Sequence, residues 1–108
     1  MMVPTLTTEQ RRENLAKAMV IRQRRAELKD QLKNGLIGIE KIFSLADDGH
    51  DEASGMRVSQ LISAMPGYGF AKTRDAMHEL HIYHGKRVKG LGVRQRRALV
   101  ELLGGDVA

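Results

Sequence analysis

The sequence contains no cysteine, only two prolines and few aromatic residues. Without cysteine the chain forms neither a disulfide framework nor a thiolate metal site, and nothing indicates an oxidising compartment. Aromatic residues make up 4% of the chain, so a stacking platform for single-stranded bases is poorly supplied. No segment approaches the roughly 20 apolar residues that cross a bilayer, and the N-terminus lacks the apolar run of a signal peptide. These absences predict a cytoplasmic protein that does not enter a membrane.

Charge is distributed unevenly along the 108 residues, whose size and 42% apolar content suit a single domain with a modest core. Lys and Arg outnumber acids eight to four in residues 1–33 and eight to two in residues 68–97, whereas acids outnumber them five to two in residues 34–67. The net charge is +5. Two basic blocks around an acidic middle favour a polyanionic partner, although basic residues also simply keep helical proteins soluble.

Apolar residues recur at helical spacing and never alternate with period two for long, which predicts an all-α protein of five helices without a sheet. The first helix is long, from about Thr7 to Asn34, because Thr7 and Gln10 fit a capping box and Asn34-Gly35 fits a C-terminal cap. Pro66 is expected to stop the third helix. The four later helices are expected at about 37–46, 58–65, 70–81 and 93–103.

Two further expectations concern the packing of these elements. Residues 47–55, reading DDGHDEASG, show no apolar period and are predicted to form a loop. In the helix at 70–81 we expect Ala71, Met77 and Leu80 to face the core. Arginines crowd the first half of the long helix, so residues 1–34 are expected to form an N-terminal arm and residues 35–108 a compact domain, within one structural unit.

Two glycine turns each precede a basic helix: Pro66-Gly67-Tyr68-Gly69 and Gly90-Leu91-Gly92. The glycines can take positive φ and let another surface approach the backbone closely. The open amides of the helix that follows each turn are expected to face a phosphate, reinforced by neighbouring Lys and Arg. Val88 and Leu91 are expected to anchor the connection between the last two helices. A turn needed only for packing is the alternative for either one.

These patterns together predict a nucleic-acid contact surface. Its predicted residues are Tyr68, Gly69, Lys72, Arg74, Lys86, Arg87, Lys89, Gly90, Gly92, Arg94, Arg96 and Arg97. Four arginines of the first helix are predicted to make a second contact: Arg11, Arg12, Arg22 and Arg25. Bending of the bound duplex can come from that second contact or from insertion of an apolar side chain, and the sequence leaves both open.

The segment GYGFAKTRDAMHELHIYHGKRVKGLGVRQRRALVELL is similar to a helix-two-turn-helix unit. Together with AELKDQLKNGLIGIEKIF and MRVSQLISAMPGYG, nearly the whole chain resembles the actinobacterial integration host factor family. The resemblance implies an S13-like fold of five helices and a nucleoid-associated protein that binds and bends double-stranded DNA with little sequence preference. It also implies support for nucleoid organisation and for phage site-specific integration, with a phage integrase complex as a partner. Lys86, Arg87 and Lys89 match the family's loop cations.

Two other classes compete with this interpretation. Ribosomal protein S13 shares the helix-two-turn-helix element, so RNA binding is the nearest alternative. DNA glycosylases use such units too, but Asp75 has no evident catalytic partner, so we expect no enzyme. His78, His81 and His84 follow at intervals of three without an interleaved carboxylate, so we expect no metal and no cofactor. A monomer is expected.

Overall fold

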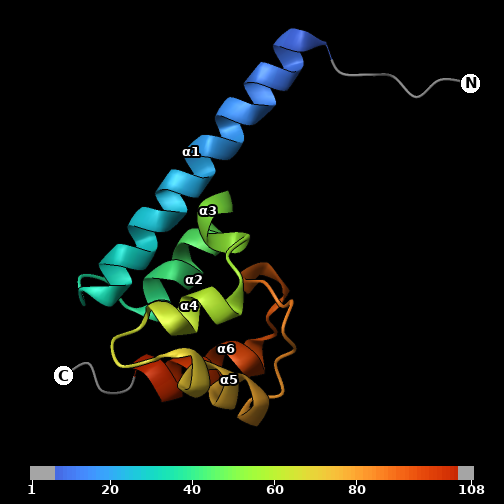
Figure 1. The fold of residues 1–108 in the computed structure, drawn as a ribbon. Coiled ribbons are helices and arrows are strands. Elements are labelled where there is room, and N and C mark those ends of the chain that lie inside the picture. The colour runs from blue at the N-terminus through green and yellow to red at the C-terminus, as the bar shows by residue number, and fades with distance from the viewer. Residues whose placement is uncertain (1–6, 105–108) are drawn as a thin grey trace, which may run out of the picture.

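The computed structural model describes residues 7–104. The fold of this part of the chain is built of helices, as the sequence predicts (Figure 1). Within this range the regular elements are helices, and extended pairing is limited to one isolated bridge between Arg57 and Arg87. The α-helices are α1 Thr8–Lys33, α2 Ile39–Asp47, α3 Asp51–Ser54, α4 Val58–Ala64, α5 Phe70–Glu79 and α6 Val93–Leu99. A 3₁₀ turn, η1, spans Val88–Gly90, and a π-helical turn, η2, continues α6 over Val100–Gly104.

The caps of α1 follow the sequence prediction at both ends. The Thr7 hydroxyl accepts from the Gln10 amide at 3.1 Å, and the Gln10 side-chain oxygen accepts from the Thr7 amide at 2.9 Å. At the other end Gly35 has φ 72°, and the Leu36 amide donates to the Gln31 carbonyl at 2.9 Å. This is a Schellman ending, in which a glycine in the left-handed region closes the last turn. The local chemistry therefore fixes where α1 begins and ends.

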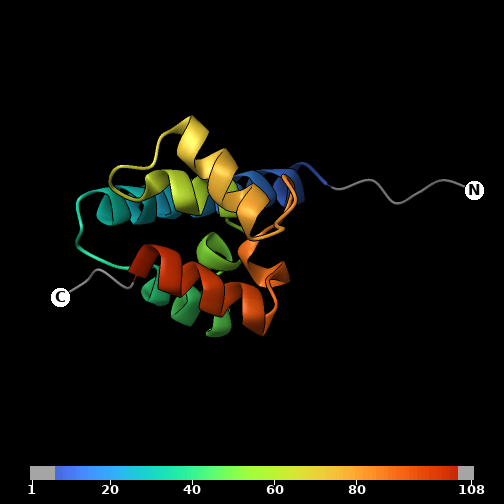
Figure 2. The same cartoon turned by 90° about the horizontal axis from the view of Figure 1, so that it is seen from below.

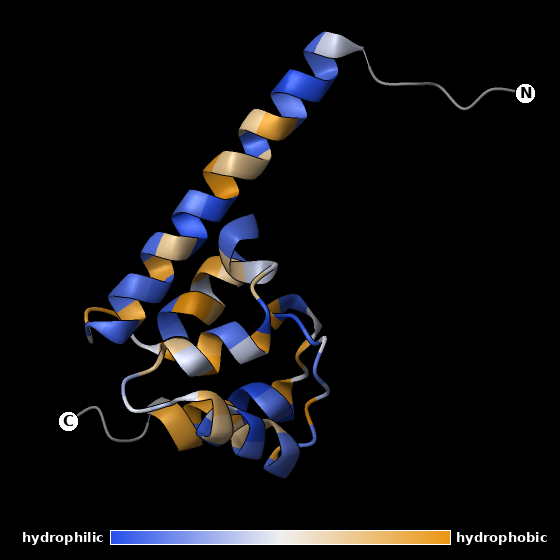
Figure 3. Cartoon of the chain, viewed as in Figure 1, coloured by the Kyte–Doolittle hydropathy of each residue, from blue (hydrophilic) through white to orange (hydrophobic). Residues whose placement is uncertain are grey.

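Full burial within α1 is limited to its last turns. Leu32 is fully buried and Leu28 packs beside it, whereas Leu15 and Met19 are more than half exposed. Figure 3 shows hydrophilic and hydrophobic residues mixed around the start of α1 instead of one apolar stripe. We call residues 8–24, which precede Arg25, the projecting segment. It accounts for a radius of gyration of 16.0 Å, against about 13 Å for a compact chain of 100 residues.

The core lies where the end of α1 meets α2, α4, α5 and α6 (Figure 2). Contacts of α4 with both α1 and α5, and of α2 with η2, close this bundle. Its buried apolar side chains are Leu32, Ile39, Ile42, Phe43, Ala53, Met56, Val58, Leu61, Ile62, Ala76, Met77, Ile82, Val88, Leu91, Leu99 and Leu103. Within residues 7–104 no helix combines the length and the apolar character that crossing a membrane requires.

The loop predicted for residues 47–55 is wrong over residues 51–54, which form the single-turn helix α3. Ala53 is fully buried and Glu52 is buried beside it. A four-residue helix is too short to show an apolar period, and isolated helices of this length do not form. Packing against α1 and α2 stabilises α3, so its cause lies outside its own sequence.

The inward face predicted for the helix at 70–81 is partly wrong. Ala71 is exposed, and the buried residues of α5 are Thr73, Ala76 and Met77, with Leu80 half-buried at the C-terminal cap. Pro66 ends α4 as predicted, since Met65 before it has ψ 142° and has left the helical region.

Candidate nucleic-acid interface

The connection from α5 to α6, residues 80–92, is fixed to the body by both apolar and backbone contacts. Val88 is fully buried and Leu91 is 8% exposed, so the two predicted anchors are confirmed. The Val58 amide donates to the Lys86 carbonyl and the Val88 amide to the Met56 carbonyl, both at 2.9 Å. A connection held in this way presents its polar side chains in a defined place.

The cations of this connection differ in what they contact. Lys86 is half-buried, and its Nζ lies 5.2 Å from the centroid of the Tyr83 ring. The exposed Arg87 donates from Nη1 to the Gly55 carbonyl. Lys89 is exposed and has no ion pair within residues 7–104. All three remain available to a solvent-side anion.

On α6 the three arginines divide into two kinds. Arg94 and Arg97 are exposed, and because they are three residues apart they share one side of the helix. Arg96 is half-buried and binds both carboxylate oxygens of Asp47 at 2.9 and 3.0 Å, while its guanidinium lies 5.1 Å from the Phe43 ring centroid. Arg96 therefore holds α6 to α2.

The glycine hairpin before α5 has one residue in the left-handed region, Gly67 with φ 83°. Gly69 is the N-cap of α5 with an ordinary negative φ, and an added Cβ there would meet open space. Tyr68 is half-buried against the core with the Lys72 ammonium 5.3 Å from its ring, and Arg74 lies 6.0 Å from the ring of Phe70. The hairpin backbone is thus open to solvent beside two cations.

The second glycine turn does not use positive φ. Gly92 is the N-cap of α6 with φ −78°, and its amide donates to the Gln95 side-chain oxygen at 3.2 Å. A Cβ added at Gly90 would come within 3.3 Å of the Lys86 side chain. Both glycines are exposed, so this backbone is accessible from solvent, but the Gly92 amide already has an acceptor.

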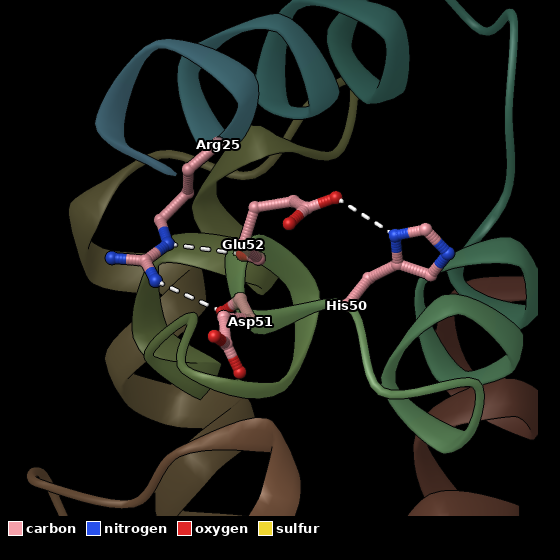
Figure 4. Close-up of polar contacts among 4 residues, drawn as sticks. All are labelled: Arg25, His50, Asp51 and Glu52. Carbon is pink, nitrogen blue, oxygen red and sulfur yellow. Dashed lines mark hydrogen bonds and ion pairs between the residues drawn. The ribbon is translucent and has the colours of Figure 1, made fainter. Parts of the chain in front are cut away.

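Among the arginines of α1, Arg25 is engaged within the protein. Its Nε donates to the Glu52 carbonyl at 3.0 Å and its Nη2 to the Asp51 carbonyl at 3.2 Å (Figure 4). Burial, and then the nearby charge of Arg87, lower the pKa of Arg25 below its usual value, although arginine stays charged at neutral pH. Arg11, Arg12 and Arg22 on the projecting segment are exposed.

The comparisons with known proteins agree on one family. The model of the S13-like H2TH domain matches residues 32–103. Integration host factor from Mycobacterium tuberculosis is 46% identical over 96% of this chain and 98% of the relative, and that of Streptomyces coelicolor 35% identical over 92% of each. The chain belongs to the actinobacterial integration host factor family. A solved structure described as sIHF bound to an 8bp palindromic DNA covers 82% of this chain, with 31% identity and a TM-score of 0.77.

The region matched by the H2TH family model contains both glycine turns and all the cations between them. The projecting segment lies outside that match. On a helix with 100° between residues, Arg11 and Arg22 fall within about 60° of Arg25, whereas Arg12 falls about 140° away. Because Arg25 faces α3, Arg11 and Arg22 point toward the side of the molecule that holds α3, and Arg12 points away from it.

One exposed cation of this surface, Arg57, was missed by the sequence analysis. It lies between α3 and α4 and is the bridge partner of Arg87. A single arginine in the acidic middle of the chain gives no periodic or compositional signal. Only the pairing of residues 56–58 with residues 86–88 brings it beside the loop cations.

Proposed function

We propose that this protein is a nucleoid-associated protein that binds and bends double-stranded DNA. The single observation that carries the proposal is the rigidly anchored connection between α5 and α6, whose exposed cations lack carboxylate partners within residues 7–104. Membership of the family and the solved structure of a relative bound to DNA support duplex DNA as the ligand. From membership of the family we also predict a role in nucleoid organisation and in phage integration, with an integrase complex as a partner.

The proposed contact has two parts, one at each end of α5. The hairpin offers the Gly69 backbone together with Lys72 and Arg74, and the loop side offers five cations in addition to the backbone of Gly90 and Gly92. The ten residues of α5 span about 15 Å along the helix axis, comparable to the roughly 12 Å width of a major groove. The five cations on the loop side are Lys86, Arg87, Lys89, Arg94 and Arg97. We assign Arg96 to the α2–α6 contact, not to DNA, because it is half-buried and its Nη1 donates to both carboxylate oxygens of Asp47.

Contacts of this kind read the phosphate backbone more than the bases. Affinity is therefore expected to depend weakly on sequence and strongly on salt. If about six phosphates are neutralised, the logarithm of the affinity falls against the logarithm of the salt concentration with a slope of about −5.

Bending is assigned to a second contact by the projecting segment. Arg11 and Arg22 lie on the side of α1 that faces α3, so they can contact a duplex that curves from the α5–α6 connection toward α1. Neutralising Arg11 and Arg22 together should reduce the bend, read by energy transfer between dyes at the two ends of a duplex of about 40 base pairs, with Arg12→Gln as the matched control. Phe70, 82% exposed at the start of α5, is the apolar side chain that would insert instead. A bend lost in Phe70→Ala and kept in the arginine variants would assign bending to insertion.

Gel shifts with matched duplex DNA and duplex RNA at two salt concentrations test the proposed ligand. Tighter binding of DNA at both concentrations is expected. Tighter binding of RNA would overturn the proposal in favour of an S13-like RNA-binding protein, because duplex RNA also presents phosphates to cations. Incubation with damaged duplex, followed by strand analysis, would reveal a glycosylase.

A further inference from the structure

Two arginines from separate segments meet at Gly55, the C-terminal cap of α3, and a third arginine, Arg57, lies opposite one of them. Arg87 donates to the Gly55 carbonyl, and the Arg25 Nη2 lies so close that a Cβ added at Gly55 would be 2.9 Å from it. Arg57 and Arg87 face each other in the isolated antiparallel bridge. The two hydrogen bonds of this bridge are made by the residues that flank the two arginines. The Val58 amide donates to the Lys86 carbonyl, and the Val88 amide donates to the Met56 carbonyl.

That hydrogen-bond pattern makes Arg57 and Arg87 a non-hydrogen-bonded pair. The Cα atoms of such a pair lie only about 4.5 Å apart, and the two side chains leave the backbone on the same face. Like charges placed directly opposite each other destabilise the pairing. The bridge that anchors the connection between α5 and α6 is therefore weakened by repulsion between the charges of Arg57 and Arg87.

The surrounding acceptors offset only part of this positive charge. The carbonyl end of a helix carries about half a negative charge even when the helix is long, and α3 has four residues. The carboxylates of Asp51 and Glu52 act favourably on Arg25, but burial and Arg87 outweigh them and its pKa is lowered. The Glu52 carboxylate forms no ion pair with Arg25; its Oε1 lies 3.2 Å from the Nδ1 of His50 (Figure 4). Within residues 7–104 no ion pair joins any of the three arginines to a carboxylate.

We propose that Arg25, Arg57 and Arg87 form a seat for one phosphate group of the DNA backbone. The inference rests on the proposed function and extends it to Arg57 and to the junction of α1 with the α5–α6 connection. A phosphate offers several anionic oxygens, and the guanidinium fork binds such oxygens in pairs. Because Arg25 belongs to α1 and Arg87 to the connection, a phosphate bound between them braces the long helix against the DNA-binding loop.

The test compares Arg57→Gln with Arg24→Gln, an exposed arginine of α1 that removes the same charge and lies about 100° around the helix from Arg25. Arg57→Gln should weaken duplex binding about three- to tenfold and make the salt slope shallower by about one. Its melting temperature without DNA should stay the same or rise, because a repelling charge is gone. Arg57→Lys, which keeps the charge and loses the fork, should keep the slope and bind more weakly than the parent protein.

A second arm uses inorganic phosphate as the probe and measures the melting temperature against sodium chloride of matched ionic strength. Stabilisation of the parent protein but not of Arg57→Gln shows that the seat takes free phosphate as well. Loss of duplex affinity without that stabilisation assigns the seat to the polymer backbone alone, which also supports the proposal. Equal duplex affinity and slope in Arg57→Gln and Arg24→Gln overturns it while leaving DNA binding intact. Failure of the parent protein to bind any duplex sinks the proposed function instead.

Discussion

Replacing Arg96 with alanine should lower the stability of the protein and leave the affinity for duplex DNA nearly unchanged. The Arg96 side chain is 25% exposed, binds both oxygens of Asp47 and covers the ring of Phe43. An ion pair with so exposed a partner is worth about 0.2–1 kcal/mol. The cation–π contact with the ring adds about 0.5–1 kcal/mol.

Together these contributions give about 1–2 kcal/mol for Arg96→Ala, and a chain of this size loses roughly 4–8 °C in melting temperature per kcal/mol. Thermal unfolding followed by circular dichroism should therefore show a loss of about 5–15 °C for Arg96→Ala. Asp47→Asn, which keeps the ring contact, should lose less than half of that, and the loss should shrink at high salt because the ion pair is screened.

The matched variant Arg97→Ala should behave in the opposite way. Its side chain is exposed and contacts no carboxylate within residues 7–104, so the melting temperature should change little while the salt slope of duplex binding becomes shallower by about one. Equal effects of both variants on duplex affinity, with no loss of stability for Arg96→Ala, would refute the division of α6 into a structural and a DNA-facing side.

Three other variants test separate parts of the structure. Neutralising Lys86 and Arg87 together should weaken binding to every duplex sequence alike and make the salt slope shallower by about two; an unchanged slope in filter binding would place the contact elsewhere. Thr73→Val should raise the stability in urea unfolding, since the buried Thr73 hydroxyl has no hydrogen-bond partner in residues 7–104 and valine has nearly the same shape; a clear loss would mean that this hydroxyl is satisfied. Gly35→Ala should cost about 1 kcal/mol because φ is 72° there while its Cβ would meet open space, and equal stability would show that the end of α1 does not need the left-handed conformation.

The features that could be predicted from the sequence depend on neighbours along the chain. The capping box of Thr7 and Gln10, the glycine ending at Gly35 and the stop at Pro66 each involve residues at most a few positions apart. Their hydrogen bonds and steric limits operate in almost any fold, so local residue types are enough to place them. The anchors Val88 and Leu91 were also predictable, because two apolar residues in a basic connection are best accommodated by burial.

Only the tertiary structure decided which cations face solvent and which hold the protein together. The sequence alone does not distinguish Arg25, Arg57 and Arg96 from the other arginines. In the fold, Arg25 donates to carbonyl groups of α3, Arg57 pairs with Arg87 and Arg96 binds Asp47, and each partner lies 26 or more positions away. The helix α3 arises for the same reason, because four residues cannot form a stable helix until α1 and α2 pack against them. Basic composition thus indicated a polyanionic ligand, but the partners of each guanidinium depend on the fold. Arg96 is held by a carboxylate, whereas within residues 7–104 Arg25 and Arg87 donate only to uncharged carbonyl groups, and no local pattern encodes this difference.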